Sequence, residues 1–111
     1  MNFELSKEQE LVQKTARDFA EKELKPIAIE NDEKSEFPVE QYKKMGEMGL
    51  IGLPYPKEYG GSGADYLSYV LAVEEISKVH ASMGISYSVT TSLCAGGIFN
   101  NASEEQKKKY L

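Results

Sequence analysis

The chain has 111 residues, enough for one domain with a modest hydrophobic core and too few for a second independent domain. Its 13 basic and 18 acidic residues give a formal net charge of -5, which disfavours binding to the phosphates of nucleic acids. The single cysteine, Cys94, excludes an internal disulfide framework, and the N-terminus resembles neither a secretory signal nor a transit peptide, so the cytoplasm is the expected compartment.

The first predicted helix begins after Ser6, because Ser6 and Gln9 have the spacing of a capping box. Side chains at three- and four-residue spacing then share one apolar face: Leu11, Val12, Thr15, Ala16, Phe19 and Ala20. Pro26 lacks a backbone N–H and its ring clashes with the carbonyl of Lys22, so the helix either stops or kinks there. No Gly follows, so a kink is favoured, with the helix ending within residues 31–34.

A second, short helix is predicted from Pro38, which suits the first helical position, to Gly49, a natural left-handed terminator. Its apolar positions are Val39, Tyr42, Met45 and Met48. The residues that follow, 55–63, are rich in Pro and Gly and predict a loop. Asp65 then provides a good N-cap for a third helix to about Val79, whose apolar residues cover most of its circumference and predict packing on more than one side.

The next segment, residues 81–103, contains no charged residue. It is long enough to raise the question of a membrane span, but its seven Ser or Thr and two Asn favour burial within protein. Residues 85–94 alternate apolar and polar side chains, which taken alone predicts a strand. A lone strand in a helical chain would leave its backbone groups unpaired, so a buried helix against the third helix is favoured.

The last predicted helix begins after Ser103, where Ser103 and Gln106 repeat the capping-box spacing. Acidic residues in its first turn and three lysines after them match the helix dipole. This helix reaches Leu111 after roughly two turns without a terminating Gly or Pro, which favours the interpretation that the chain is part of a longer protein.

Few residues offer chemistry of their own. Gly60, Gly61 and Gly63 precede a helix, but the phosphate-loop spacing is absent and a surface turn is favoured. Cys94 has no basic neighbour in sequence and predicts a buried, inert thiol, while His80 is expected at a helix end or in the core instead of as a metal ligand. The adjacent acidic pairs diverge around their helices and are expected on solvated faces: Glu74 with Glu75, and Glu104 with Glu105.

One stripe of small side chains is a better candidate. If residues 81–103 form a helix, four positions fall on one side at three- and four-residue spacing: Ser86, Val89, Ser92 and Leu93. Such a stripe either lines one wall of a cavity or permits close helix packing, and the spacing alone does not choose between them.

Three motifs, in this order, resemble the N-terminal helical domain of the acyl-CoA dehydrogenase family: residues 49–54 (GLIGLP), 56–63 (PKEYGGSG) and 73–78 (VEEISK). Residues 7–11, 23–28, 91–93 and 104–107 extend the resemblance over essentially the whole chain, which is most similar to the short-chain, butyryl-CoA-type members. The resemblance implies an all-α fold, an up-down bundle of about five helices spanning residues 1–111.

The same resemblance implies a larger flavoenzyme that desaturates a short- or medium-chain acyl-CoA. A β domain and a second helical domain, both absent here, would hold most of the FAD contacts and the catalytic glutamate, so no catalytic residue is assigned in this chain. The fourth helix of the domain would help to form the acyl pocket, which makes Ser86, Val89, Ser92 and Leu93 the candidate substrate-binding residues. Implied partners are the acyl-CoA, the remaining domains, a homotetramer, and an electron-transfer flavoprotein as acceptor.

Two alternatives stay open: a stand-alone, non-catalytic helical interaction module, and a related acyl-CoA oxidase. The isolated chain is expected to lack flavin colour and dehydrogenase activity. An apolar face that other domains would cover is also expected to make it self-associate or be only marginally stable.

Overall fold

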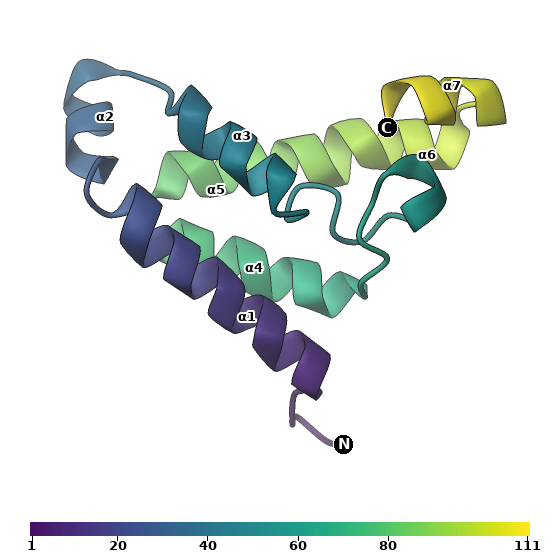
Figure 1. Cartoon of the computed structure of the whole chain (residues 1–111), viewed down its shortest axis with the longest axis horizontal. Coiled ribbons are helices and arrows are strands. Elements are labelled where there is room, and N and C mark those ends of the chain that lie inside the picture. The colour runs from purple at the N-terminus through teal and green to yellow at the C-terminus, as the bar shows by residue number, and fades with distance from the viewer.

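The computed structural model covers residues 1–111 and contains helices but no strand (Figure 1). The helices follow one another as α1 (Lys7–Phe19), α2 (Ala28–Lys34), α3 (Val39–Glu47), α4 (Tyr66–Val79), α5 (Ala81–Ser88), α6 (Gly96–Asn101) and α7 (Glu104–Tyr110). Two π-helical segments extend them, Ala20–Leu24 after α1 and Val89–Ala95 between α5 and α6, and Lys57–Tyr59 forms one 3-10 turn. The all-α fold and the up-down bundle are confirmed.

Side-chain caps fix where three of the helices begin. Ser6 and Gln9 form a reciprocal capping box at α1, and Ser103 and Gln106 form another at α7, as their spacing predicts. Asp65 caps α4 by accepting a hydrogen bond from the Ser68 N–H at 2.7 Å. The same carboxylate accepts a bond from the Gln9 side chain at 2.8 Å, which ties the first turn of α1 to the start of α4.

The chain changes direction at Pro26, as predicted. The helix widens before it, since the Lys25 N–H bonds to the Ala20 carbonyl, five residues back, at 2.9 Å. Pro26 has no N–H to continue the helix, and the break spans residues 25–27 before α2 resumes at Ala28. The helix ends at Lys34, within the predicted range, with Ser35 in the left-handed region (φ 53°).

The helix α3, predicted as the second, short helix, differs from its prediction by one residue at its start. Pro38 is the N-cap, not the first helical residue, and α3 begins at Val39. Gly49 terminates it in the left-handed region (φ 81°), as predicted. Ser62 donates a hydrogen bond from its hydroxyl to the Gly49 carbonyl at 2.8 Å, which fastens the Gly-rich loop to the end of α3.

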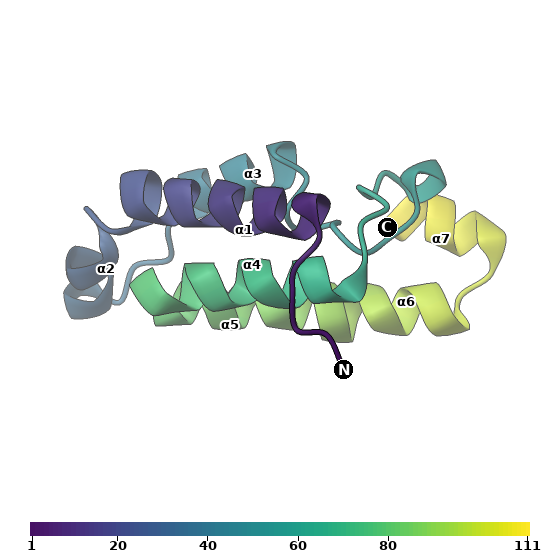
Figure 2. The same ribbon diagram turned by 90° about the horizontal axis from the view of Figure 1, so that it is seen from below.

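The bundle has two layers, with α1 and α3 in one and α4 and α5 in the other (Figure 2). The helix α4 packs against both α1 and α5, as its apolar circumference predicts. Twelve buried hydrophobic residues form one core between the layers, and they are Ala16, Phe19, Ala20, Leu24, Met45, Leu50, Leu53, Tyr69, Ala72, Ile76, Met83 and Tyr87. Leu11, predicted on the apolar face of α1, is 65% exposed.

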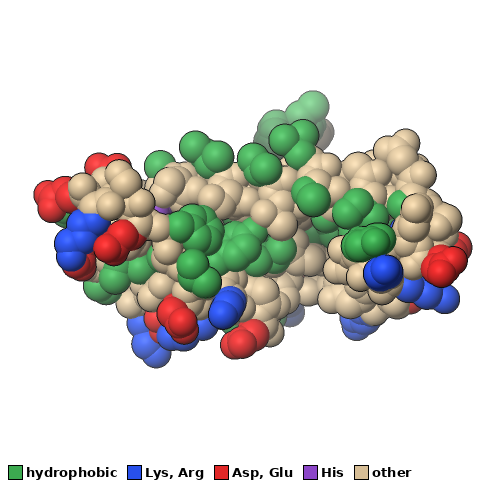
Figure 3. All heavy atoms as spheres, turned by 90° about the horizontal axis from the view of Figure 1, so that it is seen from above, with side chains coloured by type: hydrophobic (Ala, Val, Ile, Leu, Met, Phe, Trp, Pro, Cys, Tyr) green, Lys and Arg blue, Asp and Glu red, His purple; other side chains and the backbone are tan.

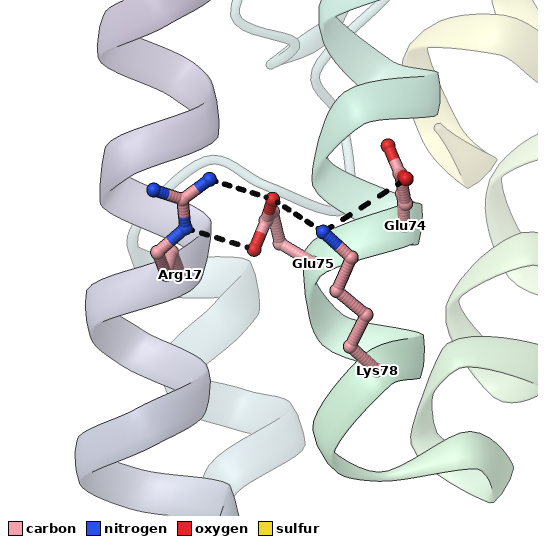
Figure 4. Close-up of polar contacts among 4 residues, drawn as sticks. All are labelled: Arg17, Glu74, Glu75 and Lys78. Atoms are coloured by element: carbon pink, nitrogen blue, oxygen red, sulfur yellow. Dashed lines mark hydrogen bonds and ion pairs between the residues drawn. The ribbon is translucent and has the colours of Figure 1, made fainter.

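An ion pair with one buried partner, Glu75, joins α1 to α4 (Figure 4). Arg17 donates from Nε and from a terminal nitrogen to the two carboxylate oxygens of Glu75, at 3.1 and 3.0 Å, and Lys78 reaches the same carboxylate at 3.2 Å. The expectation of a solvated Glu75 was therefore wrong, because its side chain is only 3% exposed. Its neighbour Glu74 does lie on the exposed face, with Lys78 at 3.9 Å.

The uncharged segment is helical from Ala81 to Asn101, so the alternating strand pattern is overridden as expected. Its inner side packs into the core through Met83 and Tyr87, while its outer side is exposed in this chain, so the expected burial within protein holds here for one side of the helix. No helix of the chain combines the length and the hydropathy that crossing a membrane requires.

Candidate functional site

An apolar ridge runs along the outer side of the helix built from α5, the π segment and α6. Its members are Ile85, Val89 and Leu93, with exposed fractions of 65%, 46% and 70%. Side chains four residues apart are neighbours on a helix surface, so the three form one strip. Figure 3 shows hydrophobic side chains gathered over α3 and α5 on this side of the molecule, with the charged side chains at its ends and lower edge.

The four predicted site residues divide between two sides of this helix. Val89 and Leu93 belong to the ridge, and half-buried Ser86 returns its hydroxyl to the Ser82 carbonyl at 3.0 Å. Ser92 instead faces the seam with α4, where its hydroxyl and that of Tyr69 lie 2.7 Å apart. The sequence stripe missed Ile85, although its position four residues before Val89 was a sufficient signal.

Two hollows lie beside the ridge helix. The larger encloses about 300 Å³ between this helix, the loop after α3 and the end of α7, and its lining includes Tyr55, Tyr59, Thr90, Cys94, Ile98 and Leu111. None of the four predicted residues lines it. The smaller, of about 260 Å³, is lined by Ser92 together with Tyr66, Phe99 and four others.

Cys94 and His80, the single cysteine and the single histidine, differ in their exposure. Cys94 is exposed on the π segment, so the expectation of a buried thiol was wrong. His80 is buried where α4 meets α5, as expected of a helix-end residue: its Nδ1 accepts the Met83 N–H at 3.3 Å and caps α5. Since Nδ1 accepts, the neutral ring carries its proton on Nε2 and donates to the Asn31 amide oxygen at 3.2 Å.

The Gly-rich turn is a structural turn, as favoured from the sequence. Its amide N–H groups are all used internally, with the N–H groups of residues 60–63 donating to the carbonyls of Lys57, Pro56, Gly52 and Tyr55 in that order. A Cβ on Gly61 would lie 2.1 Å from the Tyr55 carbonyl oxygen, so glycine is required where these two backbone segments of the loop approach each other. No N–H remains to cradle a phosphate.

Two carboxylates of the chain, Glu75 and Glu104, accept side-chain hydrogen bonds that shift their pKa values. Arg17 and Lys78 lower the pKa of Glu75, mainly through the hydrogen bond from Arg17, whereas a general base near neutral pH needs a raised pKa. Tyr59 donates to Glu104, which lowers the pKa of that carboxyl and raises the pKa of Tyr59 to about 12. No three His, Cys, Asp or Glu side chains gather as metal ligands would.

Comparison with known proteins gives one consistent family. Residues 6–111 match the family model described as "Acyl-CoA dehydrogenase, N-terminal domain". The short-chain specific acyl-CoA dehydrogenase of Clostridium acetobutylicum is 56% identical over 111 residues, which cover 100% of this chain and 29% of that protein. The chain therefore spans less than a third of the length of that relative.

Two solved structures have the same fold. Butyryl-CoA dehydrogenase from Megasphaera elsdenii superposes with a TM-score of 0.94 at 41% identity, over 100% of this chain and 30% of that one. A chain from a structure described as "Electron transferring flavoprotein of Acidaminococcus fermentans: Towards a mechanism of flavin-based electron bifurcation" superposes with a TM-score of 0.97 at 47% identity, over 100% and 29%.

Proposed function

The chain belongs to the acyl-CoA dehydrogenase family, and from this membership we propose that it contributes one wall of the acyl pocket in an FAD-dependent enzyme. That enzyme desaturates a short- or medium-chain acyl-CoA between its α and β carbons. The butyryl-CoA and short-chain names of the relatives support the substrate class. In this proposal residues 1–111 form the helical N-terminal domain of the enzyme.

The observation that carries the proposal is the apolar ridge on an uncharged helix. No residue from Ala81 to Ser103 is charged in a chain in which 28% of residues are, and Val89 and Leu93 extend into solvent from that helix. Exposed apolar strips of this kind mark surfaces that a ligand or another domain covers. Ser86 is proposed to complete this wall, because a small side chain leaves room for an acyl chain, whereas Ser92 faces the seam with α4 and would contact an acyl chain only from that side.

The physical role of such a wall is to exclude water. A dry pocket strengthens the electrostatic interactions that favour removal of a proton and a hydride, and it aligns the acyl chain for the reaction. Hydrophobic contact also selects by size, at about 0.8 kcal/mol for each buried methylene group. Val89 and Leu93 are therefore proposed to influence which chain lengths fit.

The flavin would be held elsewhere in the protein. The Gly-rich turn does not fit the flavin diphosphate, since its N–H groups are already bonded. Bound FAD supplies hydride acceptance, and the remaining domains would provide both its binding site and the catalytic base. The similarity to a chain of the Acidaminococcus fermentans electron transferring flavoprotein structure supports an electron-transferring flavoprotein as electron acceptor. A homotetramer and a cytoplasmic location complete the proposal.

The test uses the full-length protein that carries this domain. Dehydrogenation of butyryl-, hexanoyl- and octanoyl-CoA is measured anaerobically with a dye as acceptor. Replacement of Leu93 or Val89 by Trp is expected to raise KM for octanoyl-CoA about tenfold, because the larger side chain shortens the pocket, and to change KM for butyryl-CoA far less.

The matched control is Leu11→Trp on α1, away from the ridge helix, at a position that is 65% exposed, close to the 70% of Leu93. Equal effects of the control and ridge variants, or no effect of either ridge variant, would contradict the proposed wall. Hydrogen peroxide formed in air at the rate of acyl-CoA consumption would instead identify an oxidase. A protein with no acyl-CoA activity at all would favour the interaction module.

A further inference from the structure

The ridge helix contains an unusual element, the π-helical segment Val89–Ala95. A π segment costs good hydrogen-bond geometry and is rare, and such segments occur frequently at functional sites. The Gly96 N–H at its end bonds to the Leu93 carbonyl instead of reaching four residues back to Ser92. Because the hydrogen bonds within the π segment are irregular, we expect contacts from other parts of the fold to stabilise it.

That support is present on three consecutive residues of the segment. The hydroxyls of Tyr42, Tyr55 and Tyr69 bond respectively to the Thr90 hydroxyl, the Thr91 carbonyl and the Ser92 hydroxyl. The three tyrosines come from α3, the loop after it and α4, so the contacts converge from separate parts of the fold. We call these three side chains the tyrosine clamp.

Thr91 adds a fourth contact at the centre of the clamp. Its side chain is completely buried, and its hydroxyl donates to the Ile51 carbonyl at 2.7 Å. The Tyr55 hydroxyl also lies close to Gly96, where a Cβ would be in van der Waals contact with it at 3.4 Å. The segment is therefore fastened at its middle through both backbone and side-chain groups.

The π segment also accounts for the exposure of all three ridge residues. In an α-helix each residue turns by about 100°, so a residue four positions on overshoots a full turn by about 40°. In a π segment each residue turns by less than about 100°, so the four residues from Val89 to Leu93 complete less than a full turn. This shortfall cancels the excess rotation between Ile85 and Val89. All three side chains then point outward.

We propose that Tyr42, Tyr55, Tyr69 and Thr91 are positioning residues that hold the π segment in register and thereby set the acyl-length selectivity of the ridge. The inference rests on the proposed function. These residues need not touch the substrate. They act by fixing where Val89 and Leu93 stand, because a relaxed segment rotates the residues that follow it around the helix axis.

The experiment compares Thr91→Val with Thr91→Ser in the full-length protein. Valine keeps the shape and loses the hydroxyl, whereas serine keeps the hydroxyl and loses a methyl group. Amide hydrogen exchange of residues 88–97 is expected to accelerate about fivefold in Thr91→Val and to stay near wild type in Thr91→Ser, in keeping with one lost hydrogen bond. Tyr55→Phe, which removes a single oxygen from a half-buried ring, carries the same test should Thr91→Val fail to fold.

Activity provides the second readout. The ratio of kcat/KM for butyryl-CoA to that for hexanoyl-CoA is expected to shift about threefold in Thr91→Val and Tyr55→Phe, chiefly through KM, while Thr91→Ser and the control Tyr110→Phe keep the wild-type ratio. Tyr110 is exposed and forms no side-chain hydrogen bond, so it controls for loss of a tyrosine hydroxyl.

Unchanged exchange in Thr91→Val and Tyr55→Phe overturns the inference, as does faster exchange with an unchanged selectivity ratio. Greater damage from Thr91→Ser than from Thr91→Val would assign the role to packing of the methyl group and overturn it too. Failure of the proposed function is recognised separately, because the wild-type protein would then not dehydrogenate acyl-CoA.

Discussion

At the scale of single residues, Glu75 combines burial of its carboxylate with three hydrogen bonds from basic side chains. Its carboxylate is nearly inaccessible, yet it accepts two hydrogen bonds from Arg17 and one from Lys78 (Figure 4). Arg17 itself is 53% exposed, so the pair keeps one partner in water and avoids most of the desolvation cost of a fully buried ion pair. The pair fixes how α1 lies against α4.

The lowered pKa of Glu75 predicts a pH dependence of stability. A carboxyl whose pKa falls on folding, here from its usual 4.5, stabilises the folded state above that value. This stabilisation is lost as the pH falls through the lower, folded-state pKa. The free energy of unfolding, measured by urea denaturation between pH 3 and 7, should therefore decrease on acidification below about pH 4.5.

Glu75→Gln should flatten that decrease and cost about 1–2 kcal/mol at neutral pH, because charge-assisted hydrogen bonds to Arg17 become neutral ones. The slope should not vanish, since Asp65, Glu30 and Glu104 also have lowered pKa values. Glu74→Gln is the matched control, with an exposed carboxylate on the same helix turn. The same slope in Glu75→Gln and wild type would exclude Glu75 as a source of the acid sensitivity.

Glu75 and Cys94 both differ from their predictions, because their environments depend on how the helices pack. Because Glu74 and Glu75 are adjacent, their side chains were predicted to diverge around α4. Which of the two contacts α1 depends on how these helices pack, and the spacing within α4 does not determine it. Cys94 was expected to be buried because its neighbours in sequence are uncharged, but those neighbours do not determine which side of the helix faces the core, and Cys94 is exposed. His80 and the capping residues were predictable, since their partners lie within three residues.

At the scale of helices, α4 and α5 approach each other closely at Gly84. A Cβ there would lie 2.0 Å from the Ser77 Oγ, 2.9 Å from its Cβ and 3.0 Å from its Cα. The serine hydroxyl can rotate away, but the Cα belongs to the backbone of α4. Gly84→Ala must therefore force the two helices apart, and we expect a loss of about 1–3 kcal/mol in the free energy of unfolding.

Gly97→Ala, in α6 of the continuous helix from Ala81 to Asn101, is expected to stabilise the chain instead. No atom lies within 4 Å of the position a Cβ would take at Gly97, so alanine gains helix propensity without a clash and should add about 0.5–1 kcal/mol. Urea denaturation with a common m-value measures both changes. If both substitutions stabilise the chain, the close approach of α4 and α5 does not exist in solution.

Helix boundaries were largely predictable, and helix interiors were less so. Caps and prolines act locally, so the starts at Ser6, Asp65 and Ser103 and the break at Pro26 follow from short spacings. The helix from Ala81 required tertiary reasoning against an alternating pattern. Its π segment was not predicted, because the groups that support it come from Tyr42, Tyr55 and Tyr69, far away in sequence.

At the scale of the whole molecule, the fold leaves apolar surface uncovered. A single core of twelve residues lies between the two layers, while the ridge of Ile85, Val89 and Leu93 faces outward. The family resemblance made the architecture predictable, but it did not tell which side of the uncharged helix faces the core. Seen from this side, the face over α3 and α5 has charges only around its margin (Figure 3).

This surface leads to a prediction for the 111-residue chain. Exposed apolar strips drive association, since burying them removes hydrocarbon from water at roughly 25 cal/mol per Å². Sedimentation velocity should show a weight-average mass that rises with protein concentration. Replacement of all three ridge residues by Gln, a good helix former, should suppress that rise without changing the helical circular dichroism signal.

The control for this experiment is Leu11→Gln on α1, which removes an equally exposed apolar side chain outside the ridge and should leave the association in place. Equal suppression by Leu11→Gln would locate the contact elsewhere. A wild-type chain that stays monomeric at every concentration and melts at high temperature would show that the ridge needs no cover, which would remove the physical reason to place another domain or an acyl chain against it.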